Sequence, residues 1–164
     1  MHRDDKGGVR LPRISRPLSY EEFAEALAIR LRVFVDEQKV PLEEERDDLD
    51  DTAQHFGCFI SDQMVATARV LEEGKTARIG RMAVLPEYRG RGLGRVLMET
   101  MIKFCVERGC AEIQLSAQTH AIEFYAKCGF HAYGGEYMDA GIAHRSMVKK
   151  LVQDADGLEN FTKG

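Results

Sequence analysis

Arginines and glycines alternate in one short segment of the chain, Arg89-Gly-Arg-Gly-Leu-Gly-Arg95. The segment follows an apolar run that ends at Val84-Leu85-Pro86, and an amphipathic helical pattern begins directly after it. Glycines at the start of a helix let a ligand approach the backbone, whose first N–H groups have no partner within the helix. Because the helix dipole and the nearby arginines favour negative charge, the segment predicts a binding site for phosphate groups.

Two common phosphate-binding loops do not fit this spacing. A Walker loop ends in Gly-Lys-Ser/Thr, which the chain lacks. A dinucleotide fingerprint needs a small residue three positions after its second glycine, where Arg95 follows Gly92. The pattern Arg89-x-x-Gly92-x-Gly94 instead resembles the pyrophosphate loop of the GNAT (Gcn5-related) N-acetyltransferases. In that family the loop holds the diphosphate of acetyl-coenzyme A (acetyl-CoA).

A second motif lies downstream, in the segment from Gln118 to Phe130. It follows a short strand predicted over 112–117 and has the pattern of a helix that ends at Gly129. The segment resembles the GNAT run Asn-x-x-Ala-x-x-Phe-Tyr-Glu-Lys-x-Gly-Phe, which contacts the cosubstrate and supplies a tyrosine. Tyr125 occupies the position of that tyrosine. Gln118 replaces the usual asparagine and keeps an amide donor and acceptor on a longer arm.

The resemblance implies which residues bind acetyl-CoA. In this family the strand before the loop polarises the thioester carbonyl through its backbone N–H groups, and the loop binds the pyrophosphate. On this chain the implied residues are Met82, Ala83, Val84, Arg89, Gly90, Arg91, Gly92, Leu93, Gly94, Arg95, Gln118 and Tyr125. No metal is expected, because the four cysteines and the histidines lack the spacing of metal ligands.

Acetyl transfer to an amine needs an acid for the departing thiolate and a base for the acceptor. An ammonium group with a pKa of about 10.4 costs roughly 4.6 kcal/mol to neutralise at pH 7. Tyr125 is the predicted acid, with a purely structural tyrosine as the alternative. Many relatives carry a glutamate base on the strand before the loop, but Gly80 stands there. The predicted strand order puts His55 at the acceptor end as the base, since an ordinary imidazole titrates near neutral pH. The other candidates for the base are Glu136, Asp139 and His144.

The identity of the acceptor stays open. The acidic run Glu43–Asp51 is expected to be a solvated loop, which could attract a cationic amine. Arg69 and Arg81 would instead suit an acceptor with a carboxylate if both faced the cleft. We expect a primary amine of a small molecule. The alternatives are a module that binds acyl-CoA without turnover, an acetyltransferase for proteins or peptides, and, more weakly, a cysteine hydrolase built on Cys58 and His55.

The order of the expected elements is a helix, antiparallel strands, and then helix, strand, helix and a closing pair of strands. Strands are predicted over 54–61, 64–72, 76–85, 112–117, 133–138 and 144–151, and helices from Gly92 and over 120–128. The resemblance covers about 20–151 and implies the GNAT fold. That fold is an α/β (mixed α+β) domain in which helices flank one mixed, mostly antiparallel sheet with splayed central parallel strands. Further segments, among them Val33–Pro41 and Gly141–His144, resemble the ElaA- and YjcF-like bacterial subgroup.

Length and composition fit a single domain. A chain of 164 residues with 44% hydrophobic residues can bury about 70% of its unfolded surface. We expect 11–153 to form the acetyltransferase domain, with mobile ends at 1–10 and 154–164. No membrane span or signal peptide is evident, and the net charge of −4 argues against binding to nucleic acid. A reduced, cytoplasmic setting suits the unpaired cysteine pattern. The expected partners are acetyl-CoA and a small amine, and a homodimer is left open.

Overall fold

One mixed sheet organises the part of the chain that the computed structural model describes, residues 2–3, 9–10, 13–45 and 47–151. Within these residues the sheet has seven strands in the order β3-β4-β5-β6-β7-β9-β8. Only β6 and β7 run parallel, and every other adjacent pair is antiparallel. The strands are β3 (Arg13–Pro17), β4 (Gln54–Ile60), β5 (Gln63–Glu73), β6 (Thr76–Val84), β7 (Glu112–Gln118), β8 (His131–Asp139) and β9 (Ile142–Lys150).

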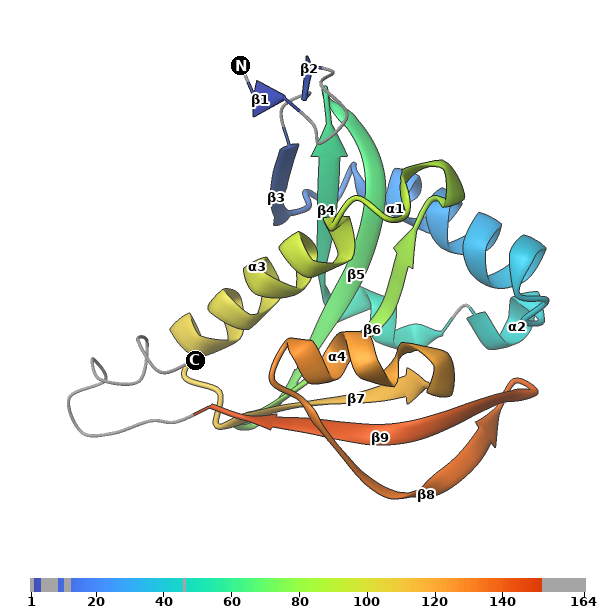
Figure 1. Ribbon diagram of the computed structural model, residues 1–164, viewed down its shortest axis with the longest axis vertical. Coiled ribbons are helices and arrows are strands. Elements are labelled where there is room, and N and C mark those ends of the chain that lie inside the picture. The colour runs from blue at the N-terminus through green and yellow to red at the C-terminus, as the bar shows by residue number, and fades with distance from the viewer. Residues whose placement is uncertain (1, 4–8, 11–12, 46, 152–164) are drawn as a thin grey trace.

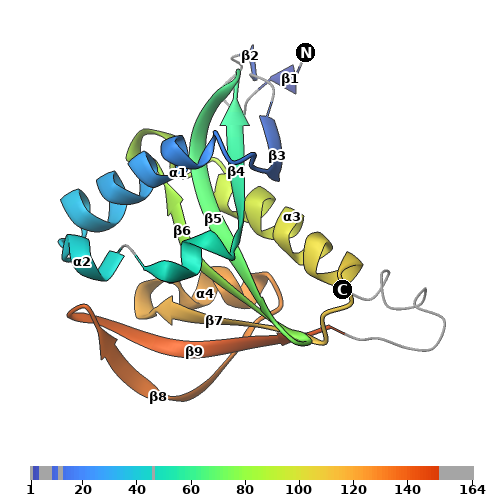
Figure 2. The ribbon, with the colours of Figure 1, turned by 180° about the vertical axis from the view of Figure 1, so that it is seen from behind.

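Helices cover both faces of the sheet (Figures 1 and 2). Helix α1 (Phe23–Arg30) continues as a π-helix, η1 (Leu31–Glu37), and packs against β5 on one face. On the opposite face, α3 (Leu93–Glu107) packs against β4 and β5, and α4 (Ile122–Lys127) packs against β7 and β8. The short helical segments are α2 (Leu42–Glu45), η2 (Asp48–Asp51), η3 (Pro86–Tyr88) and η4 (Thr119–Ala121).

Two apolar clusters hold these layers together. The larger cluster lies under α3, whose Leu97 and Met101 are fully buried because residues four apart share one helix face. The smaller cluster joins α1 and η1 to the other face of the sheet through Ala26, Ile29 and Val33. The expected helices and strands are confirmed. Packing of both helix layers on the sheet fixes the positions of the helix ends.

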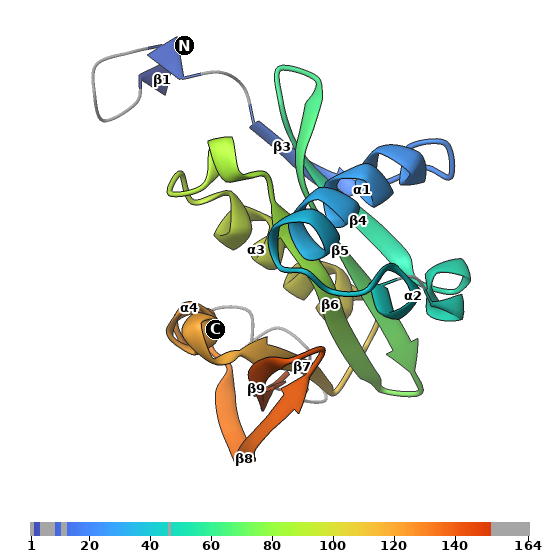
Figure 3. The same ribbon diagram turned by 90° about the vertical axis from the view of Figure 1, so that its right-hand side faces the viewer.

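The parallel pair β6–β7 is joined only at its beginning. Thr76–Arg78 pairs with Glu112–Gln114, and no pairing continues beyond these residues in the described part of the two strands. The sheet therefore opens into two halves (Figure 3), as the predicted splay requires. The backbone groups of 79–84 that face the opening need partners other than β7.

A β-bulge interrupts β6 at the start of this opening. Thr67 pairs with Ala83 and Arg69 pairs with Gly80, so that Arg81 and Met82 together lie opposite a single residue of β5. Arg81 has a φ of 54°, which is uncommon for a residue with a side chain. Bulges bend a strand and redirect its backbone groups, often beside an active site. This bulge was not predicted from the sequence.

Two segments differ from the expectations. Strand β3 was missed because its alternation rests on one apolar residue, Ile14, and because it ends in a proline at the sheet edge. The acidic run folds into α2 and η2, and its Glu45 is only 1% exposed, so it is not a solvated loop throughout. The expectation of mobile ends stays a prediction. Within 1–10, His2–Arg3 pairs with Val9–Arg10, and 154–164 lies outside the described residues. No helix among the described residues is long and apolar enough to cross a membrane.

Candidate active site

A cavity of about 1030 Å³ lies where β6 and β7 separate. Its walls come from η1 and α2 on one side, from the loop before α3 and from α4 on another, and from the turn between β8 and β9. Both sequence motifs meet here. The predicted cosubstrate residues that line the cavity are Met82, Ala83, Val84, Arg89, Gly90, Gly92, Leu93, Gly94, Arg95, Gln118 and Tyr125. Arg91 is the one predicted residue that does not line it.

The glycine loop leaves the first turn of α3 open to a ligand. Gly90 and Gly92 have φ values of 78° and 76°, a left-handed conformation that glycine adopts without steric cost. Gly92 is the N-cap residue, and the first bond of the helix runs from the Val96 N–H to the Gly92 carbonyl. The N–H groups of 93–95 therefore have no acceptor within the helix. A Cβ added at Gly92 would meet nothing within 4 Å, so the space in front of this turn is free.

The arginines of the loop point toward protein partners. The guanidinium group of Arg89 donates two hydrogen bonds to Glu37 at 2.6 and 2.7 Å and one to the Val84 carbonyl at 3.0 Å. Arg91 lies over the Tyr88 ring, 5.2 Å from its centroid. Arg89 thus ties the loop to η1, and its guanidinium group is occupied by protein partners.

Tyr125 enters the cavity from α4. Its hydroxyl group lies 4.0 Å from the sulfur of Met82, on the strand across the opening, and its ring packs edge-on against Phe124 and Phe130. Burial raises the pKa of Tyr125 to about 12. The phenol therefore keeps its proton at neutral pH, so it can donate a proton but cannot act as a base.

Gln118 bridges the two walls of the cavity. Its amide nitrogen donates to Oε1 of Gln38 at 2.9 Å, at the end of η1, and its Oε1 lies 2.6 Å from Nε2 of His120. Both ends of the Gln118 amide are thus engaged. A ligand that contacts this side chain must replace one of these two partners.

The chain matches the family model of the Acetyltransferase (GNAT) domain over residues 15–151. The chain belongs to the GNAT acetyltransferase family. It is 34% identical over 130 residues to YjcF of Bacillus subtilis (strain 168), described as an uncharacterized N-acetyltransferase, and the alignment covers 79% of this chain and 93% of YjcF.

Solved GNAT structures superimpose on nearly the whole fold. An acyl-CoA N-acyltransferase from Pseudomonas aeruginosa has 30% identity and a TM-score of 0.74, with 85% of this chain and 99% of that chain covered. ElaA of Escherichia coli has 28% identity and a TM-score of 0.75 over the same shares of the two chains. These similarities confirm the predicted family, the fold and the class of enzyme, an N-acetyltransferase. The GNAT family uses acetyl-CoA as its acyl donor.

His55 does not lie where the sequence analysis expected it. It pairs with Arg69, which pairs with Gly80, so the predicted row across the sheet is present. Its ring, however, packs on Phe23 with centroids 4.5 Å apart, and its Nε2 lies 3.0 Å from the Asp50 carbonyl. The described residues that line the GNAT cavity do not include His55. The strand order correctly predicted that His55, Arg69 and Gly80 are neighbours across the sheet. It did not predict that the His55 ring lies on the face of the sheet covered by α1.

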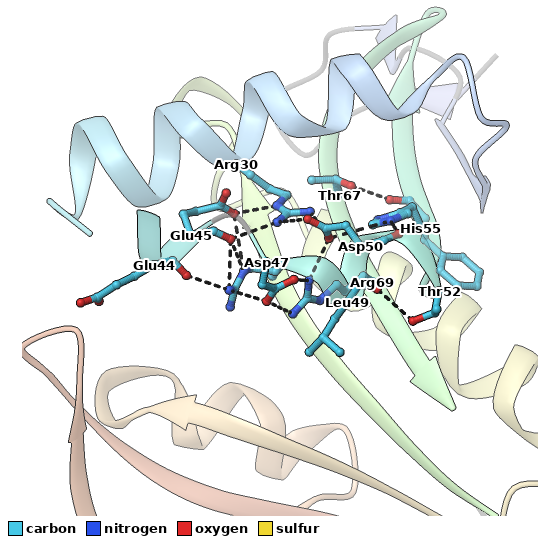
Figure 4. A network of polar contacts seen from close by, with 12 residues as sticks. Arg30, Glu44, Glu45, Asp47, Leu49, Asp50, Thr52, His55, Thr67 and Arg69 are labelled. Carbon is cyan, nitrogen blue, oxygen red and sulfur yellow. Dashed lines mark hydrogen bonds and ion pairs between the residues drawn. The ribbon is translucent and has the colours of Figure 1, made fainter. Parts of the chain in front are cut away.

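A neutral network of ion pairs begins beside His55 and extends to the cavity (Figure 4). Its members are Arg30, Arg69, Arg81, Glu45, Asp47 and Asp50. The buried guanidinium of Arg30 reaches Glu45 at 2.7 Å and Asp50 at 2.8 Å. Hydrogen bonds from Arg69 hold the pKa of Asp47 below its usual value. The spacing of acids in the run was the only sequence signal for this network.

The network also determines where the guanidinium groups of Arg69 and Arg81 point. Arg69 donates to Asp47 and Asp50 at 2.7 and 2.8 Å and is not among the described residues that line the cavity. Arg81 lines the cavity, but it donates to the carbonyl groups of Glu44 and Glu45 and to Asp47. The condition for a carboxylate-binding pair, that both face the cleft, is therefore not met.

The other candidates for the base, and the candidate nucleophile Cys58, differ in whether they reach the cavity. Asp139 and His144 line the cavity, whereas Glu136 is exposed on β8 and is not one of the described lining residues. Cys58 is fully buried, and burial raises the pKa of its thiol. Since Cys58 and His55 are three residues apart on one strand, their side chains point to opposite faces. This arrangement argues against the cysteine hydrolase.

We expect His55→Gln to remove part of the acid sensitivity of the fold. Burial, partly offset by the Asp50 contact, lowers the pKa of His55 below 6.5. As the pH falls below 6.5, the unfolded chain takes up a proton that the folded chain refuses, so wild-type stability decreases. His55→Gln should flatten this decrease when thermal unfolding is followed from pH 7.5 to 5. A variant that keeps the full decrease, yet loses the acidic limb of its pH–rate profile, would instead support the base role.

Proposed function

We propose that this GNAT enzyme transfers the acetyl group of acetyl-CoA directly to a primary amine of a small molecule, within a ternary complex. The observation that carries the proposal is that three elements line one cavity: the open edge of β6, the first turn of α3 and the hydroxyl-bearing ring of Tyr125. Each supplies one requirement of acyl transfer: a polarised carbonyl, an anchored diphosphate and a proton donor.

Unpaired backbone groups along the cavity match successive parts of acetyl-CoA: the diphosphate, the pantetheine arm and the thioester. The N–H groups of 93–95 suit the diphosphate, because unpaired donors and the helix dipole both favour an anion. The unpaired stretch of β6 would bond the amide groups of the pantetheine arm in place of a neighbouring strand. The bulge at Arg81 and Met82 would direct backbone N–H groups of Met82–Val84 toward the thioester oxygen.

The transfer itself is a single exchange at the thioester carbon. The nitrogen of the acceptor attacks this carbon, a C–N bond forms, and the C–S bond breaks after the tetrahedral intermediate. Backbone N–H groups stabilise the negative charge that develops on the carbonyl oxygen. The hydroxyl group of Tyr125 gives its proton to the departing thiolate, whose own pKa rises in the same buried environment.

The charges at the acceptor end favour a cationic molecule. The three arginines of the network are balanced by its three carboxylates. Glu44 of α2 and Asp139 at the end of β8 also line the cavity, and no described Lys or Arg forms an ion pair with either carboxylate. Because these two elements line the cavity from different walls, the acceptor end suits a compact amine with a second positive charge better than an extended peptide.

An acceptor screen tests the proposal. Thiol release from acetyl-CoA is measured with diamines, monoamines, amino acids and lysine peptides, and products are identified by mass spectrometry. We expect acetylated small amines, with diamines the best substrates. Binding of acetyl-CoA without acetylation of any amine would contradict the proposed transfer. Acetylation confined to peptides would contradict the small-molecule acceptor.

Glu44→Gln should weaken the capture of a cationic acceptor. An exposed charge pair contributes up to about 1 kcal/mol, so the KM for a diamine should rise about three- to fivefold. The kcat and the KM for acetyl-CoA should stay unchanged, because Glu44 lies on α2 and the proposed phosphate site lies at the start of α3. Glu43→Gln removes the same charge from an exposed neighbour outside the cavity lining and serves as the matched control. Equal KM changes in both variants would show that only overall charge matters.

A further inference from the structure

His144 lies inside the cavity with its ring held in place. It is the third residue of β9, is only 9% exposed, and lines the cavity. It pairs with Gln118 on β7 and with Tyr137 on β8. The Tyr137 ring stacks beside it at 6.0 Å, and the Tyr137 hydroxyl is itself hydrogen-bonded to Ser116. These contacts restrict the rotation of the imidazole.

One hydrogen bond fixes where the proton of the neutral imidazole sits. Nδ1 of His144 lies 2.7 Å from the carbonyl oxygen of Ile142. A carbonyl oxygen can only accept, so Nδ1 must be the donor and carries the hydrogen. In the neutral ring, Nε2 therefore keeps its lone pair. Nε2 has no hydrogen-bond partner among the described residues, which leaves it free to accept a proton from a ligand.

Because Gly80 replaces the glutamate base of many relatives, another residue must accept the proton of the acceptor amine. A Cβ added at Gly80 would meet nothing within 4 Å, so β6 leaves open space where a carboxylate side chain would stand. His144 lines the same cavity from the other half of the divided sheet. A base on β9 can thus approach an acceptor in the opening without any side chain at Gly80.

The other titratable groups of the cavity suit the task less well. The Oε1 of Glu45 is bonded to Arg30, and its Oε2 is buried without a partner, closed off from bulk water. Asp139 is exposed at the end of β8, and His120 is exposed with its Nε2 against Gln118. Among the described residues, His144 alone combines a buried ring, a donor-fixed tautomer and a place in the cavity lining.

We propose that His144 is the general base that deprotonates the acceptor amine, an inference that rests on the proposed acetyl transfer. Nε2 takes a proton from the ammonium group, and the nitrogen lone pair then attacks the thioester carbon. The nitrogen loses a second proton as the amide forms. Of these two protons, one makes up for the proton that Tyr125 gives to the thiolate, and the other leaves to solvent. No oxidant or further reactant is needed.

His144→Asn tests this role directly. The Asn amide can donate to the Ile142 carbonyl as Nδ1 does, but it has no basic nitrogen. We expect kcat to fall by about 10²- to 10⁴-fold, the usual contribution of a general base. The affinity for acetyl-CoA, measured by calorimetry, should stay within twofold of wild type. His131→Asn changes an exposed histidine of the same hairpin, outside the cavity lining, and should leave kcat unchanged.

A second variant separates a lost base from a damaged fold. In His144→Ala, added imidazole should restore turnover in proportion to its concentration, whereas it should not stimulate wild type or Tyr125→Phe. A His144→Asn variant with kcat within threefold of wild type would overturn the assignment. So would a folded His144→Ala variant that binds acetyl-CoA but gains nothing from imidazole. If wild type itself acetylates no amine, the proposed transfer fails first and the base role falls with it.

Discussion

Gly92→Trp is expected to abolish the binding of acetyl-CoA. Gly92 caps α3 with a φ of 76°, and the space beyond its Cβ position is open. A tryptophan side chain would fill the space in front of the free N–H groups of 93–95. Each hydrogen bond to a charged group is worth about 1.5–3 kcal/mol, so the loss of two should weaken binding by at least ~100-fold. Isothermal titration calorimetry of the folded variant measures the effect.

Gly109→Trp is the matched control for this substitution. Gly109 follows α3, has a φ of 79° and also faces open space, so both variants have the same left-handed backbone cost of about 1–2 kcal/mol. Gly109 is outside the described cavity lining. Its variant should lose stability as Gly92→Trp does and still bind acetyl-CoA normally. Unchanged affinity in folded Gly92→Trp would disprove the assignment of the phosphate site.

Tyr125→Phe should slow turnover by about 10²-fold or more without changing the affinity for acetyl-CoA. The substitution keeps the ring that packs against Phe124 and Phe130 but removes the proton donor. Loss of a general acid costs about 10²- to 10⁴-fold. The rate constant is measured at saturating acetyl-CoA and amine, in parallel with calorimetric binding.

Tyr88→Phe provides the comparison for Tyr125→Phe. Tyr88 also lines the cavity, but its hydroxyl group faces Gln63 at 3.4 Å. Its removal should leave the rate constant unchanged. If Tyr125→Phe stays within twofold of wild type, Tyr125 is structural and water protonates the thiolate.

Local patterns predicted most of the fold and the cosubstrate side of the site. The glycine loop, the strand before it and the helix after it are contiguous in sequence, so their geometry follows from turn and helix chemistry. The motif around Tyr125 is contiguous as well. The structure places both motifs in one cavity, while the binding and catalytic roles of their residues stay predictions.

The acceptor side was less predictable because it depends on contacts between distant segments. The burial of Glu45 requires Arg30, fifteen positions earlier, and the network further requires Arg69 on β5. The direction of a ring, as at His55, depends on which helix covers that face of the sheet. The tautomer of His144 depends on a single carbonyl contact with Ile142. None of these properties has a periodic signature in the sequence.

The balanced charges beneath the acceptor end constrain how this enzyme can diversify. Removing one partner of a buried ion pair leaves an uncompensated charge and costs about 3–5 kcal/mol, a large part of the stability of a domain. Changes at Arg30 or Glu45 are therefore tolerated only as coordinated pairs, a slow route for adaptation. Glu44 on α2 and Asp139 at the end of β8 form no ion pair with a described Lys or Arg, so each can change alone. New acceptor preferences should therefore arise first through changes at Glu44 and Asp139, while the ion-pair network of Arg30 and Glu45 stays unchanged.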